Sequence, residues 1–233
     1  MNDRELINLI TRKVLEQVQS LPCEGCAMQT CDGERACHIT AQQNQIPVGV
    51  SARHAHLTKE HLEQLYGPGR ELTVRADLYQ PGNFAAEEVV TVVGPRMRAI
   101  EGVRILGPLR NYSQVEIART DAITLGLDPP IRDSGDLKGA APILLVGPAG
   151  SVFLEEGAIC AARHVHLTPE DAECLGVKAG DELKVRIPGI RALTFENVRP
   201  KIGEGVLPQL HLDTDDANAA GIRGGEAIEI IKE

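Results

Sequence analysis

Residues 51–60 read Ser-Ala-Arg-His-Ala-His-Leu-Thr-Lys-Glu, and residues 161–170 read Ala-Ala-Arg-His-Val-His-Leu-Thr-Pro-Glu. Seven of the ten positions are identical at a constant offset of 110 residues, which indicates two related structural units in one chain. In each copy the Arg-His-x-His segment is predicted to end a strand. A threonine, Thr58 or Thr168, is predicted to cap the short helix that follows. Pro169 suits the first position of the second helix, where a backbone N–H has no partner within the helix. Two such units facing each other would bring two copies of one site together.

From Gln45 onward the chain consists of short runs rich in Val and Ile, separated by Gly and Pro. Helices are predicted only after Thr58, after Thr168 and near residues 214–220. Many short strands with turn residues between them are typical of barrels and sandwiches, so the predicted fold class is mainly β. The predicted strands cover residues 46–51, 71–75, 89–93, 103–106, 114–118, 143–146, 182–187, 193–198, 206–212 and 227–231.

The composition excludes several classes of protein. The chain has 233 residues, of which 42% are hydrophobic, enough to bury a core without disulfides and too many for a disordered chain. Its net charge is −9, only 3% of its residues are aromatic and Trp is absent, so a nucleic-acid-binding surface is not expected. The longest uncharged run, residues 139–154, is too short for a membrane span, and charged residues 3–5 argue against a secretory signal. The cysteines are therefore expected to be thiols or metal ligands in a reducing cytosol.

Residues 1–44 differ from the rest of the chain. Residues 3–19 carry an apolar stripe at helical spacing. This favours an amphipathic helix that docks on a partner, with a terminal helix packed on the protein as the alternative. Residues 20–44 contain four cysteines and a histidine spaced as C-x2-C-x4-C-x5-C-H, which fits no common zinc-finger or ferredoxin pattern. A linker with free thiols is therefore favoured over a bound metal. The stripe consists of Leu6, Ile7, Ile10, Val14 and Val18, and the second motif of Cys23, Cys26, Cys31, Cys37 and His38.

The two Arg-His-x-His segments suggest a metal site. Side chains at i and i+2 of a strand project to one face, so His54 and His56 point together, as do His164 and His166. Two imidazoles on one face form half of a zinc-type site. A single pair would be weak evidence, but the chain holds only 7 histidines and four of them lie in these matching repeats.

The same alternation supplies further candidate ligands. His211 shares a face with Asp213, and Glu116 shares a face with Gln114. Three protein ligands with one open position would indicate a catalytic metal, although His211 and Glu116 could each instead be solvated strand residues. His61 is expected at the surface.

Three arginines lie near these motifs. Arg53 and Arg163 are each expected to pair with an acidic residue. Arg110 could clamp a phosphate or carboxylate, or could equally be structural. Neither a phosphate-binding loop nor a nucleophile elbow is present, and Cys160 is expected in the core, so any chemistry should be metal-centred.

These residues carry a resemblance that covers almost all of residues 46–231. The chain resembles the phosphate propanoyltransferases, the phosphotransacylases of bacterial microcompartments. It departs from their pattern in having Ala52 where Asn is usual and Ser113 where Thr is usual, and neither change removes a candidate ligand. The matching stretches are residues 48–57, 77–88, 106–110, 114–117, 134–136, 162–167 and 211–220.

The resemblance implies a pair of β-barrels with short capping helices and two zinc ions between them. His54, His56 and Glu116 would hold one ion, whose open position takes the sulfur of coenzyme A. His164, His166 and His211 would hold the other ion, which keeps waters or phosphate, and Arg110 matches the family's active-site arginine. The implied domains are a targeting helix at residues 1–19, a Cys-rich linker at 20–44, one barrel from 45–53 and 162–233, and a second barrel from 54–161.

The implied reaction converts a short-chain acyl-CoA, such as propanoyl-CoA or acetyl-CoA, and phosphate into acyl phosphate and coenzyme A. Other divalent metals could replace zinc. The resemblance also implies a homo-oligomer in the lumen of a bacterial microcompartment, in propanediol degradation, with residues 1–19 binding shell or lumen proteins. Two alternatives remain open: a dinuclear metal-dependent thioesterase or hydrolase, and a non-catalytic metal-binding protein of the compartment.

Overall fold

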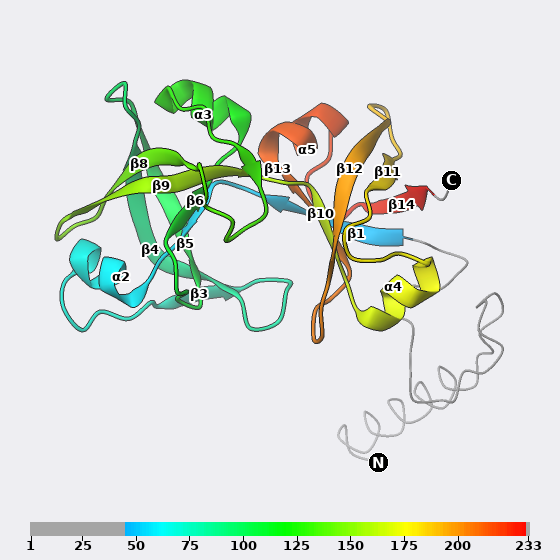
Figure 1. The fold of residues 1–233 in the computed structure, drawn as a ribbon, viewed down its shortest axis with the longest axis horizontal. Coiled ribbons are helices and arrows are strands. Elements are labelled where there is room, and N and C mark those ends of the chain that lie inside the picture. The colour runs from blue at the N-terminus through cyan, green and yellow to red at the C-terminus, as the bar shows by residue number, and fades with distance from the viewer. Residues whose placement is uncertain (1–44, 232–233) are drawn as a thin grey trace, which may run out of the picture.

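The computed structural model of the chain describes residues 45–231, which form two closed β-barrels side by side (Figure 1). The mainly β fold with two barrels and short helices, predicted from the sequence and the family resemblance, is confirmed. The predicted targeting helix, residues 1–19, and the Cys-rich linker, residues 20–44, lie outside the described residues. Among residues 45–231, no helix has the length and apolar character that crossing a membrane requires.

The C-terminal barrel closes in the strand order β1-β13-β10-β12-β11-β14. Its core is aliphatic with one aromatic ring, Phe195, and includes Val165, Leu167, Leu210 and Ile228, each at most 1% exposed apart from the 6% of Phe195. Helices α4 (Pro169–Leu175) and α5 (Thr214–Ala220) cover its openings. Its strands are β1 (Gln45–Ser51), β10 (His164–Leu167), β11 (Leu183–Ile187), β12 (Leu193–Ile202), β13 (Gln209–Asp213) and β14 (Ala227–Ile231).

The middle barrel closes through β4, β5, β2, β6, β9 and β8, which pairs again with β4. Strands β3 (Val74–Asp77) and β7 (Ile131–Arg132) extend this sheet beside β4 and β9. Helices α2 (Lys59–Tyr66) and α3 (Arg119–Leu125) pack against the barrel. Its six strands are β2 (His54–His56), β4 (Phe84–Val93), β5 (Ala99–Gly107), β6 (Gln114–Glu116), β8 (Ala141–Val146) and β9 (Ser151–Ala161).

The two barrels repeat one pairing pattern. In both, the histidine strand (β2 or β10) lies parallel to one neighbour and antiparallel to the other. The antiparallel neighbour of the histidine strand is β6 in the middle barrel and β13 in the C-terminal barrel. On its other side β6 pairs with β9, and β13 pairs with β1, both in parallel. Strand β1 therefore fills, from the beginning of the described chain, the place that β9 fills in the other barrel. Each of these two strands runs on into the histidine strand of the opposite barrel.

The helix caps follow the sequence signals with one exception. Thr58 and Thr168 accept hydrogen bonds from the backbone N–H groups of His61 and Asp171, as predicted. Helix α3 was not predicted, because its N-cap is Ala118, which has no side chain that can accept a bond. The equivalent helix α5, which was predicted, is capped by Asp213.

Arg53 and Arg163 lie in the two crossover segments, where β1 runs on into β2 and β9 into β10. Each arginine binds a helix beside its segment. Arg53 binds Asp121 of α3 at 2.9 Å, and Arg163 binds Asp216 of α5 at 2.7 Å, so each arginine pairs with an acid as expected. Direct contacts also join the barrels, since Thr120 N–H donates to Asp215 at 2.8 Å. These contacts set the position of one barrel relative to the other, and thereby the shape of the cleft between them.

Candidate metal centre between the barrels

The six predicted ligand residues all line one cleft of about 780 Å³ between the barrels. The middle barrel contributes the end of β2 and β6, and the C-terminal barrel contributes β10 and β13. The cleft exists because both histidine strands begin where the chain crosses from one barrel to the other. The repeat therefore brings two related groups of side chains to the same junction.

The His-Glu set consists of His54, His56 and Glu116, and all three residues are buried. Strands β2 and β6 pair with His54 directly opposite Glu116, so a residue 62 positions away in the chain enters the site through strand register. One carboxylate oxygen of Glu116 lies 3.6 Å from Nε2 of His54, and the other lies 4.0 Å from Nε2 of His56.

The three-His set consists of His164, His166 and His211. The register of β10 and β13 places His164 opposite His211, as His54 lies opposite Glu116 in the other barrel. The ring centroids lie 4.8–5.1 Å apart. In both sets, one candidate ligand atom from each residue lies within 4.8 Å of the other two.

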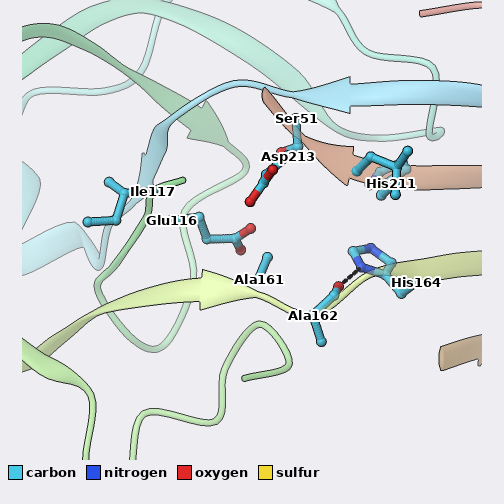
Figure 2. A pocket seen from close by; sticks show the side chains of 9 residues that line it. Ser51, Glu116, Ile117, Ala161, Ala162, His164, His211 and Asp213 are labelled. Carbon is cyan, nitrogen blue, oxygen red and sulfur yellow. Dashed lines mark hydrogen bonds between the residues drawn. The ribbon is translucent and has the colours of Figure 1, made fainter. Parts of the chain in front are cut away.

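Backbone carbonyl groups fix the orientation of three of these rings. The Nδ1 atom of His54 lies 2.9 Å from the carbonyl oxygen of Ala52, and Nδ1 of His164 lies 2.8 Å from that of Ala162, as Figure 2 shows for the second pair. Nδ1 of His56 lies 3.3 Å from the carbonyl of Leu106. A carbonyl only accepts, so each Nδ1 carries the hydrogen and each Nε2 keeps a lone pair for a metal.

Two glutamines support the third residue of each set. Gln114, fully buried on β6, donates from Nε2 to Glu116 Oε1 at 2.7 Å. Gln209 lies at the equivalent place on β13, and its Oε1 accepts a hydrogen bond from Nε2 of His211 at 2.7 Å. An amide oxygen only accepts, so Nε2 of His211 carries the hydrogen and Nδ1 keeps the lone pair.

The electrostatics of the cleft keep His56 and His211 in the neutral form that a metal ligand needs near neutral pH. Burial, with the charges of His54 and Arg110, lowers the pKa of His56 to about 3. Burial, with His166 and Lys201, lowers that of His211 to about 3. These rings are neutral at pH 7, as a metal ligand must be.

Glu116 and His54 form a coupled pair. Burial opposes the ionised carboxylate, but the charges and hydrogen bonds of His54 and His56 outweigh it and lower the pKa of Glu116. Burial likewise opposes protonation of His54, yet Glu116 outweighs it and raises the pKa of that imidazole. Each of these two groups therefore favours the charged form of the other, and a divalent cation at this set would likewise favour the ionised carboxylate.

The donor types fit zinc or a similar divalent ion. Two imidazoles and a carboxylate form one set, three imidazoles form the other, and each set leaves a coordination position open. Three of the rings are already held by hydrogen bonds from the nitrogen that faces away from the set.

Arg110 enters the cleft from the segment before β6. Its Nη1 group donates to Tyr112 Oη at 2.5 Å and to Ser134 Oγ at 3.0 Å. Ser134 also accepts from Gln114 Nε2 at 2.9 Å, so one network joins Arg110 to the residue that holds Glu116. Among the described residues these two bonds use only Nη1, which leaves the Nε and Nη2 hydrogens of the guanidinium for a ligand.

A smaller pocket lies deeper, where the two crossover segments pass. Figure 2 shows Glu116 and His164 on its wall, with Asp213 beside Ser51 at the end of β1. Its volume of about 20 Å³ is close to the space that one water needs. Asp213, predicted to share a face with His211, also caps α5 by accepting from Asp216 N–H at 2.8 Å.

Several other sequence expectations can be compared with the structure. His61 is half-buried, lies 2.7 Å from Ser113 Oγ and belongs to neither candidate ligand set. Cys160 is buried, and burial raises the pKa of its thiol to about 11, as a core cysteine requires. His38 and the four-cysteine motif lie outside the described residues.

Sequence reasoning missed four residues around the site. Ser134 lies in a stretch that matched the family, and Gln114 was noted only because it shares a face with Glu116. The repeat offers a signal for Gln209, because it precedes His211 as Gln114 precedes Glu116. Lys201 carried no sequence signal at all, because only the pairing of β12 with β10 places it beside His166.

Comparison with known proteins gives a consistent result across both barrels. A family model described as phosphate propanoyltransferase matches residues 47–223. The phosphate propanoyltransferase of Lachnoclostridium phytofermentans is 52% identical over 186 residues, covering 80% of this chain and 87% of the relative. That of Thermotoga maritima is 50% identical over 188 residues, covering 80% and 89%. That of Salmonella typhimurium is 43% identical over 220 residues, covering 94% and 93%.

Proposed function

This chain belongs to the phosphate propanoyltransferase family, an acyltransferase family, and on that premise we propose that it transfers the acyl group of a short-chain acyl-CoA to inorganic phosphate. Propanoyl-CoA and acetyl-CoA are the proposed donors, and acyl phosphate and coenzyme A are the products. The observation that carries the proposal is the convergence of two candidate metal-binding sets and Arg110 in one cleft.

The proposed cofactor is a pair of zinc-type ions, one at the His-Glu set and one at the three-His set. When bound, they would supply Lewis-acid stabilisation for the departing sulfur and for the attacking phosphate. The chain's own residues hold these positions through rings that are oriented in advance of substrate binding, so little reorganisation is needed during the reaction.

Arg110 is the proposed phosphate-orienting residue. Phosphate must approach a thioester carbonyl with an oxygen aimed at carbon, and its charge must be held while it does so. A planar guanidinium fixed by Tyr112 and Ser134 presents two remaining N–H groups in a fork that matches two phosphate oxygens.

The reaction needs no covalent enzyme intermediate. A phosphate oxygen forms the new bond to the acyl carbon, and the bond from that carbon to sulfur breaks with its electron pair leaving on sulfur. Hydrogen phosphate loses one proton, and the sulfur of coenzyme A gains one proton to become the thiol, so the reaction balances. The described residues therefore need to position the two substrates and neutralise their charge. They need not supply a nucleophile.

The test is release of free thiol from acetyl-, propanoyl- and lactoyl-CoA, with and without phosphate. We expect release to depend on phosphate, and acyl phosphate to form in equal amount, because phosphate is the acceptor. A dinuclear thioesterase made from the same metal sets would instead release thiol at the same rate without phosphate. That outcome would replace the transferase proposal with the hydrolase.

We further propose that residues 1–19 direct the enzyme to the lumen of a bacterial microcompartment by binding a shell or lumen protein. The support is the apolar stripe, because an amphipathic helix gains most of its stability by packing its apolar face, and the stripe resembles ligands that bind as a helix in a groove. The enzyme is also proposed to be a homo-oligomer there.

Deleting residues 1–19 should leave phosphate-dependent turnover and thermal stability nearly unchanged, and should abolish co-sedimentation with shells. Leu6→Glu or Ile10→Glu should have the same effect, because each places a charge in the stripe. Lys13→Glu, outside the stripe, is the matched control and should co-sediment normally. Unfolding or lost turnover in the truncated protein would show that the segment packs on the barrels, and would refute the targeting proposal.

A further inference from the structure

Lys201 is a charged residue of the cleft wall that has no charged counterpart at the equivalent position of the middle barrel. It pairs with His166 where β12 runs beside β10, and Arg199 on the same face of β12 pairs with His164. In the middle barrel the register places Arg104 beside His54, and the next residue on that face is Leu106, whose carbonyl contacts His56. At the equivalent position, therefore, the middle barrel has Leu106 beside the His-Glu set and the C-terminal barrel has Lys201 beside the three-His set.

The ammonium of Lys201 has no partner among the described residues. Its neighbour Arg199 is neutralised by Asp133, with 2.9 Å between Nη1 and Oδ2. The second oxygen of Asp133, Oδ1, is buried and accepts no hydrogen bond in the described part of the chain. Lys201 itself forms no ion pair or side-chain hydrogen bond there, although it is half-buried and lines the cleft.

The charge of Lys201 acts directly on the three-His set. Besides burial, it is a cause of the lowered pKa of His164, His166 and His211. Burial also lowers the pKa of Lys201, and the charges of Glu116 and Asp133 partly offset this. Independently of these shifts, Lys201 lines the same cleft as the three rings and is paired with His166 in the register of β12 and β10.

This arrangement leaves an imbalance of charge. The His-Glu set contains a carboxylate, whereas the three-His set contributes only neutral imidazoles and has a lysine beside it. A divalent ion there would lie next to an unpaired ammonium, which is favourable only with an anion between them. The half of the cleft that belongs to the C-terminal barrel is therefore built for a small dianion.

Resting on the proposed function, we propose that Lys201 binds the phosphate substrate, holding it at the three-His set opposite Arg110. The two cations come from different barrels, Arg110 from the segment before β6 and Lys201 from β12. Inorganic phosphate is favoured over the phosphate groups of coenzyme A, because Lys201 lies beside His166 of the three-His set, on the wall of the cleft that also holds Arg110.

The test compares Lys201→Met and Lys201→Gln with the wild type. Both should raise the KM for phosphate about tenfold, which corresponds to one charge-assisted hydrogen bond, while the KM for acyl-CoA stays unchanged. Titration calorimetry of the metal-loaded protein with inorganic phosphate, without acyl-CoA, should show the same loss of affinity. Lys201→Arg should recover most of it, and metal content should stay at the wild-type value in all three variants.

Lys178→Met is the matched control, because it removes the same charge from an exposed position after α4 and should leave both KM values unchanged. An unchanged Kd for phosphate in Lys201→Met, or a rise in the KM for acyl-CoA instead, would overturn the assignment. If the wild type binds phosphate through Lys201 but shows no phosphate-dependent turnover, the proposed function fails and the assignment stands.

Discussion

His164→Ala is expected to abolish nearly all phosphate-dependent turnover while the barrels stay folded. His164 is held by the Ala162 carbonyl and faces two other rings, so its loss opens the three-His set. We expect a decrease in kcat of roughly 1,000-fold or more, since a metal contributes several kcal/mol to such a reaction. Metal analysis should show one ion fewer per chain, and the far-UV spectrum should not change.

His61→Ala is the matched control for this experiment. Among residues 45–231, His61 is the histidine that lies outside both sets, and from the first turn of α2 it contacts Ser113. Its removal should leave metal content and turnover close to wild type. Active His164→Ala protein with full metal content would contradict the ligand assignment. Metal analysis must use protein without residues 1–44, so that the cysteine motif does not contribute to the count.

Arg110→Lys is expected to be the second most damaging change. Lysine keeps the positive charge but loses the planar fork, and it cannot both bond Tyr112 and Ser134 and still present two parallel donors. We expect kcat/KM for phosphate to fall roughly 100-fold, the effect of losing one preorganised donor at a reacting centre. Metal content should not change, because Arg110 is not a ligand.

Steady-state kinetics with phosphate as the varied substrate measure this effect. Arg119→Lys is the matched control, because Arg119 lies exposed on α3 and pairs only with Asp128 among the described residues. It should behave as wild type. If Arg110→Lys keeps normal kinetics for phosphate, the arginine only supports Ser134 and Tyr112, and its role as a phosphate clamp is wrong.

Local sequence patterns were sufficient to predict which histidines lie together in each half of the candidate site. The repeated Arg-His-x-His segments located four histidines, and strand alternation then grouped His54 with His56 and His164 with His166. Thr58 and Thr168 were correctly identified as caps. These inferences succeeded because each depends on residues only a few positions apart, where backbone geometry alone decides which side chains share a face.

Helix α3 was not predicted, because local sequence signals for it are weak. Its cap residue Ala118 provides no side-chain acceptor. Its first turn is marked only by Asp121, which binds Arg53 through Oδ1 and accepts from the Ala118 backbone N–H through Oδ2. The helix forms because its buried face, Ala122 and Leu125, packs into the core of the middle barrel. That stabilisation comes from residues distant in the chain and leaves little trace in the local pattern.

The sequence by itself determined that two histidine pairs exist, which residues could join them, and that the fold is mainly β. Only the tertiary structure decided that the pairs share one cleft, through register between strands whose residues lie far apart in the chain. It also decided the charge state of two candidate ligands, because burial and neighbouring charges lower the pKa of His56 and His211 to about 3. Lys201 shows the same division, since an isolated lysine in a strand becomes part of a site only when β12 pairs with β10 and water is removed around it.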